Sequence, residues 1–311
     1  MNGILNINKP QGMTSHDVVA TVRKIIHEKK VGHAGTLDPN ATGVLPVLIG
    51  SATKCSDFFL ELGKAYKATA RFGLTSDTQD IWGTVTEKTD FCPDNITEAA
   101  VAETLKSFEG TIFQVPPAYS AIKMNGIPLY KLARKGAAPE QAARPVIVYK
   151  AELLRAYKED GAVLADIYIH CGRGTYIRTV INDLGERLGC GAVMSSLTRV
   201  SYGELKIDNG LTVEELKSLG TAEIEGLLVK SDSIFSECGE IRLSEAEFMH
   251  YMQGRRVYVP ADRLCGEPFA DTVRLYKENS FFATCGIEPS EDKSHFRLIP
   301  GRYFGLETAE L

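Results

Sequence analysis

The chain has 311 residues, 44% of them hydrophobic and 24% charged, and a formal net charge of −5 at pH 7. This composition is typical of a soluble globular protein, and the length predicts either one large domain with a small one or two of similar size. It excludes a transmembrane protein, because no apolar run approaches the ~20 residues that span a bilayer. Nor does the N-terminus show a basic segment followed by a long apolar stretch, so we expect no signal peptide, no membrane partner and a cytoplasmic location.

The seven cysteines are odd in number, and no two have C-x-x-C spacing. This pattern argues against a zinc site and against a disulfide framework. It favours thiols in a reducing compartment, and we expect no metal.

Charge is unevenly distributed along the chain. Residues 1–204 hold 23 Lys and Arg against 21 Asp and Glu, a net of +2, whereas residues 205–311 hold 12 against 19, a net of −7. If RNA is the partner, it binds the first two-thirds of the chain, through local basic clusters.

The first predicted elements are a strand, a helix and a loop. Residues 3–10 alternate like a strand that Pro10 ends. Ser15 then resembles a helix cap, with apolar residues at helical spacing through Ile26 and with Lys29 and Lys30 closing the helix. Residues 31–46 hold three glycines and two prolines, which predicts a loop.

Further along, we expect a strand, a turn and a second strand in residues 64–86. A helix follows in residues 97–109, opened by Thr97 and ended by Gly110. Residues 114–146 contain five prolines and five Lys or Arg residues, which indicates a long, partly ordered basic excursion from the core.

The remaining elements are a strand at 163–170, a helix at 175–188 that Gly189 ends, and an acidic stretch at 212–238. Residues 240–304 are predicted to form a separate small domain of short strands. Its turns are expected at Gly254, Gly266, Gly286 and Gly301.

Asp38 is the first candidate for chemistry. It precedes Pro39, which stiffens the loop, and a carboxylate on a stiff loop suits a nucleophile or a base. An Asp-Pro pair is more often only a turn, however, and its spacing alone does not indicate catalysis.

Three other residues have a functional and an ordinary interpretation. Arg178, in the helix after Gly172–Thr175, suits an anion site or is a surface arginine packed by its stem. Tyr66, between Lys64 and Lys67, suits base stacking or is a core tyrosine. His33, in the loop of Asp38, is equally ambiguous.

Seven ordered blocks carry a resemblance to a known family: Asn8–Ser15, Gly32–Pro46, Lys64–Ala68, Asp77–Asp80, Gln114–Lys123, Gly174–Thr179 and Leu197–Arg199. Over these blocks, which span about 200 residues, the chain resembles the bacterial TruB-type tRNA pseudouridine synthases. Beyond residue 240 the resemblance is weak.

The resemblance implies a mixed α/β (α+β) pseudouridine synthase fold with a curved, largely antiparallel sheet, here residues 1–238, and a small β-rich PUA-like RNA-binding domain, here residues 239–311. Residues 117–145 correspond to an insertion that clamps RNA. The implied substrate is the uridine at position 55 in the T arm of tRNA. No cofactor, metal or guide RNA is implied, and we expect a monomer.

The resemblance also assigns roles to residues. Asp38 is the catalytic carboxylate, Arg178 its ion-pair partner and Tyr66 the ring that stacks on the target base. Leu197 is an apolar wall that excludes water. His33 and Tyr176 contact RNA, and Lys9 supports the active-site region.

The chemistry requires a base that is flipped out, detached from ribose at nitrogen 1, rotated and reattached through carbon 5. Asp38 could attack ribose or base, or remove a ribose proton, by a logic similar to that of retaining glycosidases. Three competing hypotheses remain: a nucleosidase that releases the base, a tRNA folding chaperone with secondary catalysis, and a guide-RNA-dependent relative.

Overall fold

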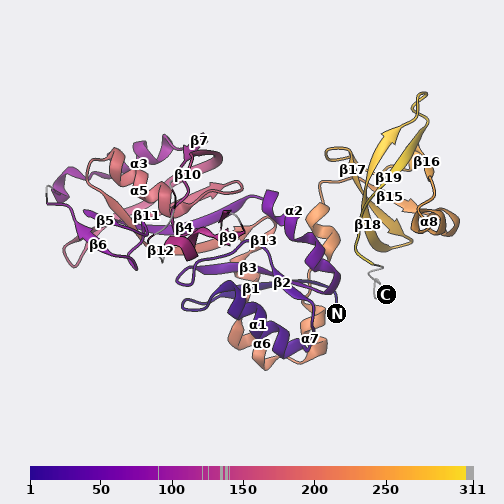
Figure 1. Ribbon diagram of the computed structural model, residues 1–311, viewed down its shortest axis with the longest axis horizontal. Coiled ribbons are helices and arrows are strands. Elements are labelled where there is room, and N and C mark those ends of the chain that lie inside the picture. The colour runs from indigo at the N-terminus through magenta and orange to yellow at the C-terminus, as the bar shows by residue number, and fades with distance from the viewer. Residues whose placement is uncertain are drawn as a thin grey trace.

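The computed structural model describes residues 1–89, 91–120, 122–124, 126–133, 136, 139 and 141–305. Within these ranges a large body built on one sheet is followed by a smaller body built on a second sheet (Figure 1). No helix in the described part of the chain is long and apolar enough to cross a bilayer.

The large sheet has ten strands, in the order β14-β1-β3-β12-β4-β11-β10-β7, with β2 beside β3 and β13 beside β12. Only the β1–β14 and β3–β12 pairs are parallel, so the expected largely antiparallel sheet is confirmed. The strands are β1 (Gly3–Lys9), β2 (Val31–His33), β3 (Thr42–Ile49), β4 (Lys64–Phe72), β7 (Gly110–Gln114), β10 (Arg144–Glu159), β11 (Ala162–Cys171), β12 (Ala192–Tyr202), β13 (Leu205–Lys206) and β14 (Leu211–Thr212).

Eight α-helices and five short 3₁₀ helices lie in the described part of the chain. The α-helices are α1 (Ser15–Ile26), α2 (Ser56–Glu61), α3 (Glu98–Lys106), α4 (Leu129–Ala133), α5 (Ile177–Arg187), α6 (Val213–Ser218), α7 (Thr221–Gly226) and α8 (Glu245–Met252). The 3₁₀ helices are η1 (Gly50–Cys55), η2 (Pro93–Asn95), η3 (Ile207–Asn209), η4 (Ser231–Phe235) and η5 (Ala261–Arg263).

The sequence of α1 explains why this segment forms a helix. Thr14 caps it, and Thr14 and Asp17 bond each other's backbone N–H groups in a capping box. The buried side chains Val18, Val19 and Val22 recur at helical spacing and pack on the sheet. The predicted cap at Ser15 was therefore wrong by one residue, because the hydroxyl of Ser15 bonds Leu37 instead.

Two apolar clusters fill the large body. One lies between α3, α5 and the strands β4, β11 and β12, and it includes Leu37, Tyr66 and Leu197. The other lies between α1, α6 and the strands β1 to β3. Figure 1 shows α3 and α5 on one side of this body and α1, α6 and α7 on another.

Several predicted boundaries were wrong. Residues 31–46 are not one loop, since β2 and β3 occupy its two ends and leave residues 34–41 between them. Helix α1 ends at Ile26, before Lys29 and Lys30, because His27 adopts a left-handed conformation. The second strand expected in residues 64–86 is present but begins only at Val85, and its partner is the short strand β5 (Leu74–Ser76).

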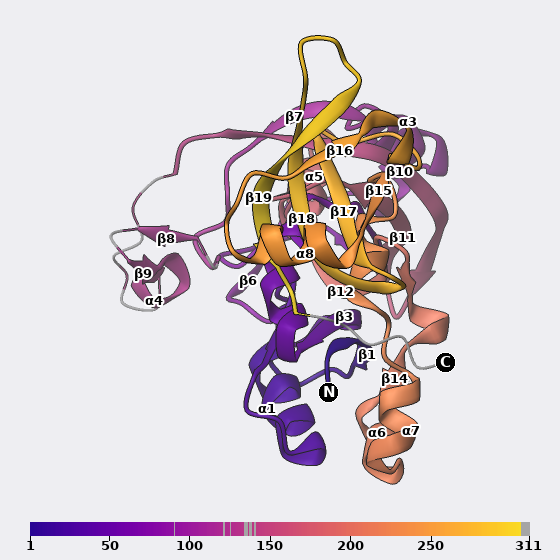
Figure 2. The same cartoon turned by 90° about the vertical axis from the view of Figure 1, so that its right-hand side faces the viewer.

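Short hairpins complete the large body: β5 (Leu74–Ser76) with β6 (Val85–Glu87), and β8 (Lys123–Met124) with β9 (Ile127–Pro128). The second hairpin and α4 belong to the predicted basic excursion. Figure 2 shows them standing away from the sheet, while β10 resumes the sheet at Arg144. Seven residues of the excursion lie outside the described residues: positions 121, 125, 134, 135, 137, 138 and 140.

The smaller body has five strands in the order β15-β17-β18-β19-β16, with α8 packed on them. They are β15 (Glu240–Leu243), β16 (Tyr258–Pro260), β17 (Thr272–Lys277), β18 (Ser280–Pro289) and β19 (His295–Tyr303). Gly286 and Gly301 lie inside β18 and β19, so the turns expected there were wrong. The proposed division after residue 238 and the PUA-like character stay predictions.

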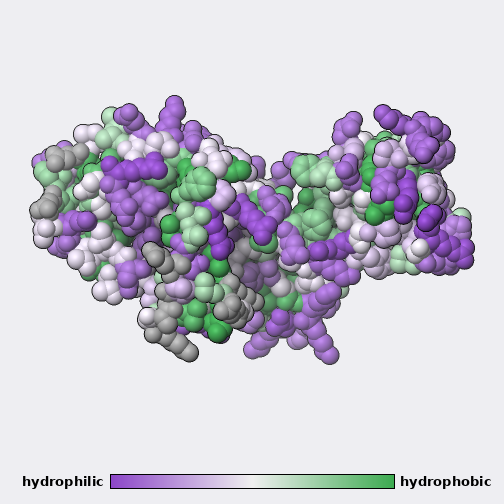
Figure 3. Space-filling model, turned by 45° about the horizontal axis from the view of Figure 1, so that its top comes forward, coloured by the Kyte–Doolittle hydropathy of each residue, from purple (hydrophilic) through white to green (hydrophobic). Residues whose placement is uncertain are grey.

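The two bodies share an apolar cluster. The ring of Phe235, in η4, lies 4.7 Å from that of Phe58 in α2 and 5.7 Å from that of Phe304 after β19. Arg302 also donates to the Lys54 carbonyl. Figure 3 shows the narrow junction between the bodies on a face that is otherwise largely hydrophilic. Phe235 and Phe304 are buried, so apolar packing joins the two bodies.

Candidate active site

Asp38 lies in the loop 34–41 that joins β2 to β3. The loop is fixed to α1 by Leu37, whose N–H donates to the Ser15 hydroxyl at 2.9 Å while its carbonyl accepts from the same hydroxyl at 3.2 Å. The N–H of Gly12 donates to the carbonyl of Pro39 at 2.9 Å. The Asp38 side chain remains 44% exposed, so a stiff backbone presents a carboxylate that a substrate can reach.

Arg178 holds this carboxylate from the first turn of α5. Its Nε lies 3.1 Å from Oδ2 of Asp38, and its side chain is only 6% exposed. The other guanidinium nitrogens donate to the carbonyls of Thr78, at 3.0 Å, and Tyr119, at 2.9 Å. Oδ2 of Asp80 lies 3.8 Å from Nη1 of Arg178. The expected ion pair is therefore present, but it is a single contact and not a two-point one, because the rest of the fork bonds other segments.

Lys9 lies beneath the loop and is completely buried. Its ammonium donates to the carbonyls of Pro10, Met13 and Pro39 at 2.9, 2.6 and 3.0 Å. Burial lowers the pKa of Lys9 to about 8, while the charge of Asp38 acts in the opposite direction. Lys9 thus ties the end of β1 to the residue that follows Asp38, and its geometry suits a supporting role.

Tyr66 and Leu197 form an apolar wall near Asp38. Tyr66 is in β4 and Leu197 in the neighbouring β12, where it pairs with Ala68, and both belong to the same buried cluster as Leu37. Burial raises the pKa of Tyr66, and the charge of Arg199 opposes that rise. The phenol therefore stays protonated at neutral pH, and its hydroxyl can donate a hydrogen bond.

Tyr176 and His33 lie on different sides of the site. Tyr176 precedes α5, where its N–H donates to Gln114 at 2.8 Å and its carbonyl accepts from the same amide at 3.1 Å. Burial raises the pKa of its phenol, and Arg178 and Asp38 both act on it. His33 ends β2, and the charge of Arg199 adds to burial in lowering its pKa. Arg178 pairs with Asp38, and the charge of Asp38 acts on Lys9, Tyr66 and Tyr176. Leu197 packs in the cluster of Leu37, and His33 lies just before the Asp38 loop.

All but one of the predicted site residues fall within two family models. Residues 23–177 match the N-terminal domain of the TruB family of pseudouridylate synthases, and residues 178–229 match the tRNA pseudouridylate synthase B C-terminal domain. The chain belongs to the TruB family. Asp38 and Tyr66 lie in the first match and Arg178 begins the second, whereas Lys9 and residues 230–311 lie outside both.

Curated relatives cover nearly the whole chain. A protein of Alkaliphilus oremlandii named tRNA pseudouridine synthase B is 43% identical over 94% of this chain and 95% of its own length. One of the same name from Dehalococcoides mccartyi is 39% identical over 94% of each. A third, from Staphylococcus saprophyticus, is 45% identical over 70% of this chain and 72% of its own length.

Solved structures support the fold. A chain in the crystal structure of the archaeal box H/ACA sRNP Nop10–Cbf5 complex is 23% identical and superposes with a TM-score of 0.69 over 97% of this TruB-family chain and 86% of its own. A chain in a Cbf5–Nop10–Gar1 complex is 25% identical, with a TM-score of 0.68 over 97% and 84%. The predicted pseudouridine synthase fold is confirmed.

Arg199 is a site residue that our reading of the sequence did not assign. Its side chain is buried, and it donates to the carbonyl of Val44 at 2.6 Å and to that of Gly35 at 2.8 Å. It therefore fixes both ends of the Asp38 loop to β12. Gly43 makes this approach possible, since a Cβ there would lie 2.2 Å from the Arg199 carbonyl oxygen.

Asp80, Thr78 and Tyr119, which surround Arg178, were also missed as site residues. They lie inside blocks that carried the resemblance, so a signal was present, but a block does not reveal which of its residues face one arginine. Among the described residues no group of three His, Cys, Asp or Glu is placed to hold a metal ion.

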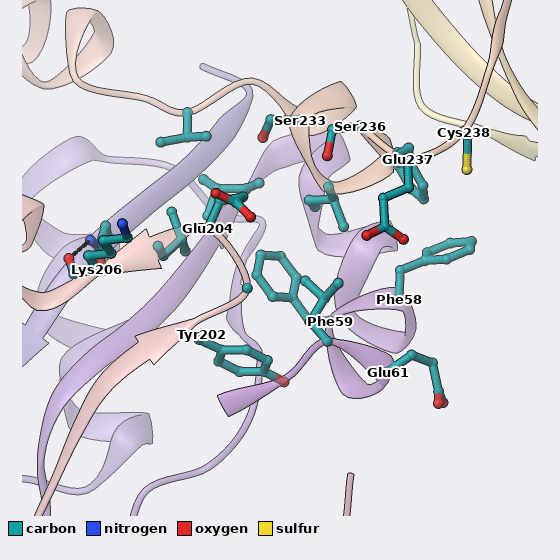
Figure 4. Close-up of a pocket in the computed structure, with 18 of the residues that line it drawn as sticks. Phe58, Phe59, Glu61, Tyr202, Glu204, Lys206, Ser233, Ser236, Glu237 and Cys238 are labelled. Carbon is teal, nitrogen blue, oxygen red and sulfur yellow. Dashed lines mark hydrogen bonds between the residues drawn. The ribbon is translucent and has the colours of Figure 1, made fainter. Parts of the chain in front are cut away.

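One cavity adjoins this site, and another lies away from it. One, of about 530 Å³, adjoins Tyr176 and Gln114 and is lined by Arg144, Tyr149 and Arg173. The other, of about 640 Å³, lies away from Asp38 at the junction of the two bodies (Figure 4).

Proposed function

We propose that this protein isomerises uridine to pseudouridine at position 55 in the T arm of tRNA. The observation that carries the proposal is the pairing of a half-exposed carboxylate, Asp38, with a buried guanidinium, Arg178, beside an apolar wall. Membership of the TruB family and three relatives named tRNA pseudouridine synthase B support it.

The reaction breaks the bond between ribose carbon 1′ and nitrogen 1 of the base and forms one between carbon 1′ and carbon 5. Carbon 5 loses a proton and nitrogen 1 gains one, so the mass of the RNA does not change. Asp38 is the catalytic carboxylate, and Arg178 keeps it ionised and oriented. Such a reaction fails if water captures the sugar, and the wall of Tyr66 and Leu197 excludes water from one side.

Tyr66 has two proposed tasks. Its ring stacks on the flipped uridine, and its protonated hydroxyl serves the proton transfers at the base. The buried backbone pairing of β4 with β11 and β12 supports both, because it fixes the ring relative to the loop of Asp38.

RNA is proposed to approach along the cavity beside Tyr176. Arg144 and Arg173 are exposed there, and Tyr149 presents a half-exposed ring, a combination that suits a phosphate chain and a stacked base. The hairpin of β8 and β9 and helix α4, which belong to the excursion of residues 117–145, stand away from the sheet (Figure 2). The excursion is proposed to clamp the T arm. His33 is proposed to contact RNA at the other end of the loop.

We further propose that residues 239–311 form a PUA-like RNA-binding domain and that the protein acts alone, as a cytoplasmic monomer without guide RNA or cofactor. The structurally similar archaeal chain comes from a box H/ACA assembly. The relatives that share 39–45% identity carry the tRNA synthase name instead, and they favour the stand-alone form.

The test is to incubate pure protein with an unmodified tRNA transcript, with no other RNA present, and to map pseudouridine. We expect one site, at position 55, with no change in RNA mass. Loss of mass would indicate a nucleosidase, and activity only on addition of a second RNA would indicate a guided enzyme. If an Asp38→Asn variant refolds tRNA as well as the wild type does but neither makes pseudouridine, the protein is a chaperone.

A further inference from the structure

The cavity at the junction of the two bodies has no part in the proposed reaction. Its volume is about 640 Å³, and it is lined by α2, β13, η4 and the start of β17. Its walls are mostly apolar, from the residues Phe58, Phe59, Leu62, Leu205, Ile234 and Phe235. This size and lining are those of small-molecule sites, which measure roughly 300–1,000 Å³.

The charged groups of the cavity are mainly carboxylates. Glu61, Glu204 and Glu237 line it, against the single ammonium of Lys206. Glu61 pairs with Arg173 at 2.6 Å, whereas Glu204 and Glu237 have no hydrogen bond or ion pair among the described residues. Figure 4 shows Glu237 reaching toward the space beside the Phe58 and Phe59 side chains, with Glu204 on the opposite side of Phe59.

A buried acceptor lines the same cavity. The amide nitrogen of Asn6 donates to the Lys206 carbonyl at 2.8 Å, but its Oδ1 is buried without a partner in the described part of the chain. Asn6 is 7% exposed. An unsatisfied buried acceptor costs free energy, and its partial negative charge adds to that of the carboxylates around the cavity.

We propose that this cavity binds a small organic cation, an apolar body that carries one ammonium group. The apolar walls bury the body, the ring of Phe59 favours a nearby cation, and the unpaired carboxylates of Glu204 and Glu237 attract its ammonium from opposite sides of that ring. The same carboxylates repel a phosphate chain, and of the residues that line this cavity only Glu61 also lines the one proposed for RNA. The proposal therefore goes beyond the proposed function.

Three probes of nearly equal shape test the proposal on the full chain: 3-phenylpropylammonium, 3-phenylpropan-1-ol and 3-phenylpropanoate. Calorimetric titration is expected to show that affinity falls from the ammonium to the alcohol to the carboxylate, with at least a tenfold difference in affinity between the first and the last. Glu204→Gln and Glu237→Gln should each lower the affinity for the ammonium about threefold and leave the affinity for the alcohol unchanged. Glu225→Gln is the matched control, since Glu225 lies in α7 and does not line the cavity.

Location is tested with Ser233→Trp and Ser236→Trp, which place a large ring at the cavity and should abolish binding of the ammonium and the alcohol alike. Asp38→Asn should bind the ammonium as the wild type does, so the result does not depend on the isomerase activity. Equal affinity for all three probes, no binding at millimolar concentration, or binding that survives both tryptophan variants would overturn the proposal.

Discussion

Replacing Arg178 by lysine keeps the positive charge but removes the shape that the site uses. The guanidinium reaches three acceptors in three directions: Asp38 at 3.1 Å, the Thr78 carbonyl at 3.0 Å and the Tyr119 carbonyl at 2.9 Å. A lysine ammonium is a point charge on a flexible stem and reaches at most one of them in the same geometry.

The magnitude follows from those contacts. Hydrogen bonds to charged groups contribute about 1.5–3 kcal/mol each, so losing two of the three should lower the free energy of unfolding by about 3 kcal/mol or more. Because Asp38 is half exposed, the lower end of the range, about 1.5–2 kcal/mol, applies to its contact with Arg178. That corresponds to about a 10- to 30-fold loss in rate.

The assay is single-turnover formation of pseudouridine on one tRNA transcript, with chemical denaturation to measure stability. Arg155→Lys is the matched control, because the exposed side chain of Arg155 makes one ion pair, with Asp166, and does not line the cavity proposed for RNA. We expect it to react within about threefold of the wild type. If Arg178→Lys reacts equally fast, Arg178 does not orient Asp38, and the proposed pairing has no catalytic meaning.

Three further substitutions test other parts of the site. Asp38→Asn should eliminate turnover while tRNA affinity, measured by filter binding, stays within about threefold; measurable pseudouridine would contradict the mechanism. Tyr66→Phe should keep tRNA affinity but slow the single-turnover rate by about 10²-fold or more, as expected for a lost proton-transfer group, and an unchanged rate would leave the hydroxyl without a role. Gly43→Ala should lower the free energy of unfolding by about 3 kcal/mol or more in a denaturant titration, because φ is +99° and the new Cβ would lie 2.2 Å from the Arg199 carbonyl oxygen. Gly12→Ala is the control, since Gly12 has a similar φ of +84° with open space around it, and it should lower that free energy by only about 1–2 kcal/mol.

Local patterns in the sequence predicted the elements whose signals are local. The apolar period of α1 and the turn chemistry after β1 lie within a few residues, so both were predicted correctly apart from the two ends of the helix. The 16-residue strand β10 was not predicted, because its outer residues are exposed and its alternation is broken by charged side chains. Its position depends on pairing with β11 and β7, which no local pattern contains.

The candidate site also has residues that the sequence predicts and contacts that only the fold brings together. Asp38 could be selected because a carboxylate before proline in a glycine-rich loop is visible in the sequence, and the family blocks added Arg178. The contacts that fix these two residues, from Thr78, Tyr119 and Arg199, join segments 59 to 164 residues apart, so their convergence is a property of the sheet. Arg199 was overlooked because a buried arginine that bonds carbonyl oxygens is not distinguishable by sequence from an exposed one.

Two buried lysines should make stability depend on pH above neutrality. Burial lowers the pKa of Lys9 and of Lys64 from 10.5 to about 8 in the folded chain. Between about pH 8 and 10.5 the unfolded chain therefore binds more protons than the folded chain at these two positions. Since stability rises with pH wherever the unfolded state binds more protons, the contribution of both lysines to the free energy of unfolding should increase across that window.

Lys9→Met isolates one of them. The variant should lose part of the rise in stability between pH 8 and 10, because one of the two shifted groups is gone. It should also be less stable than the wild type, because the carbonyls of Pro10, Met13 and Pro39 lose their donor. Lys67→Met is the control, since Lys67 is exposed on β4 and its loss should leave the slope unchanged. Denaturant titrations at pH 7, 8, 9 and 10 measure the three slopes. If the slope for Lys9→Met equals that of the wild type, the pKa of Lys9 is not lowered in the folded chain. The hydrogen bonds of its ammonium, including the one to the Pro39 carbonyl beside Asp38, would then offset the effect of its burial in full.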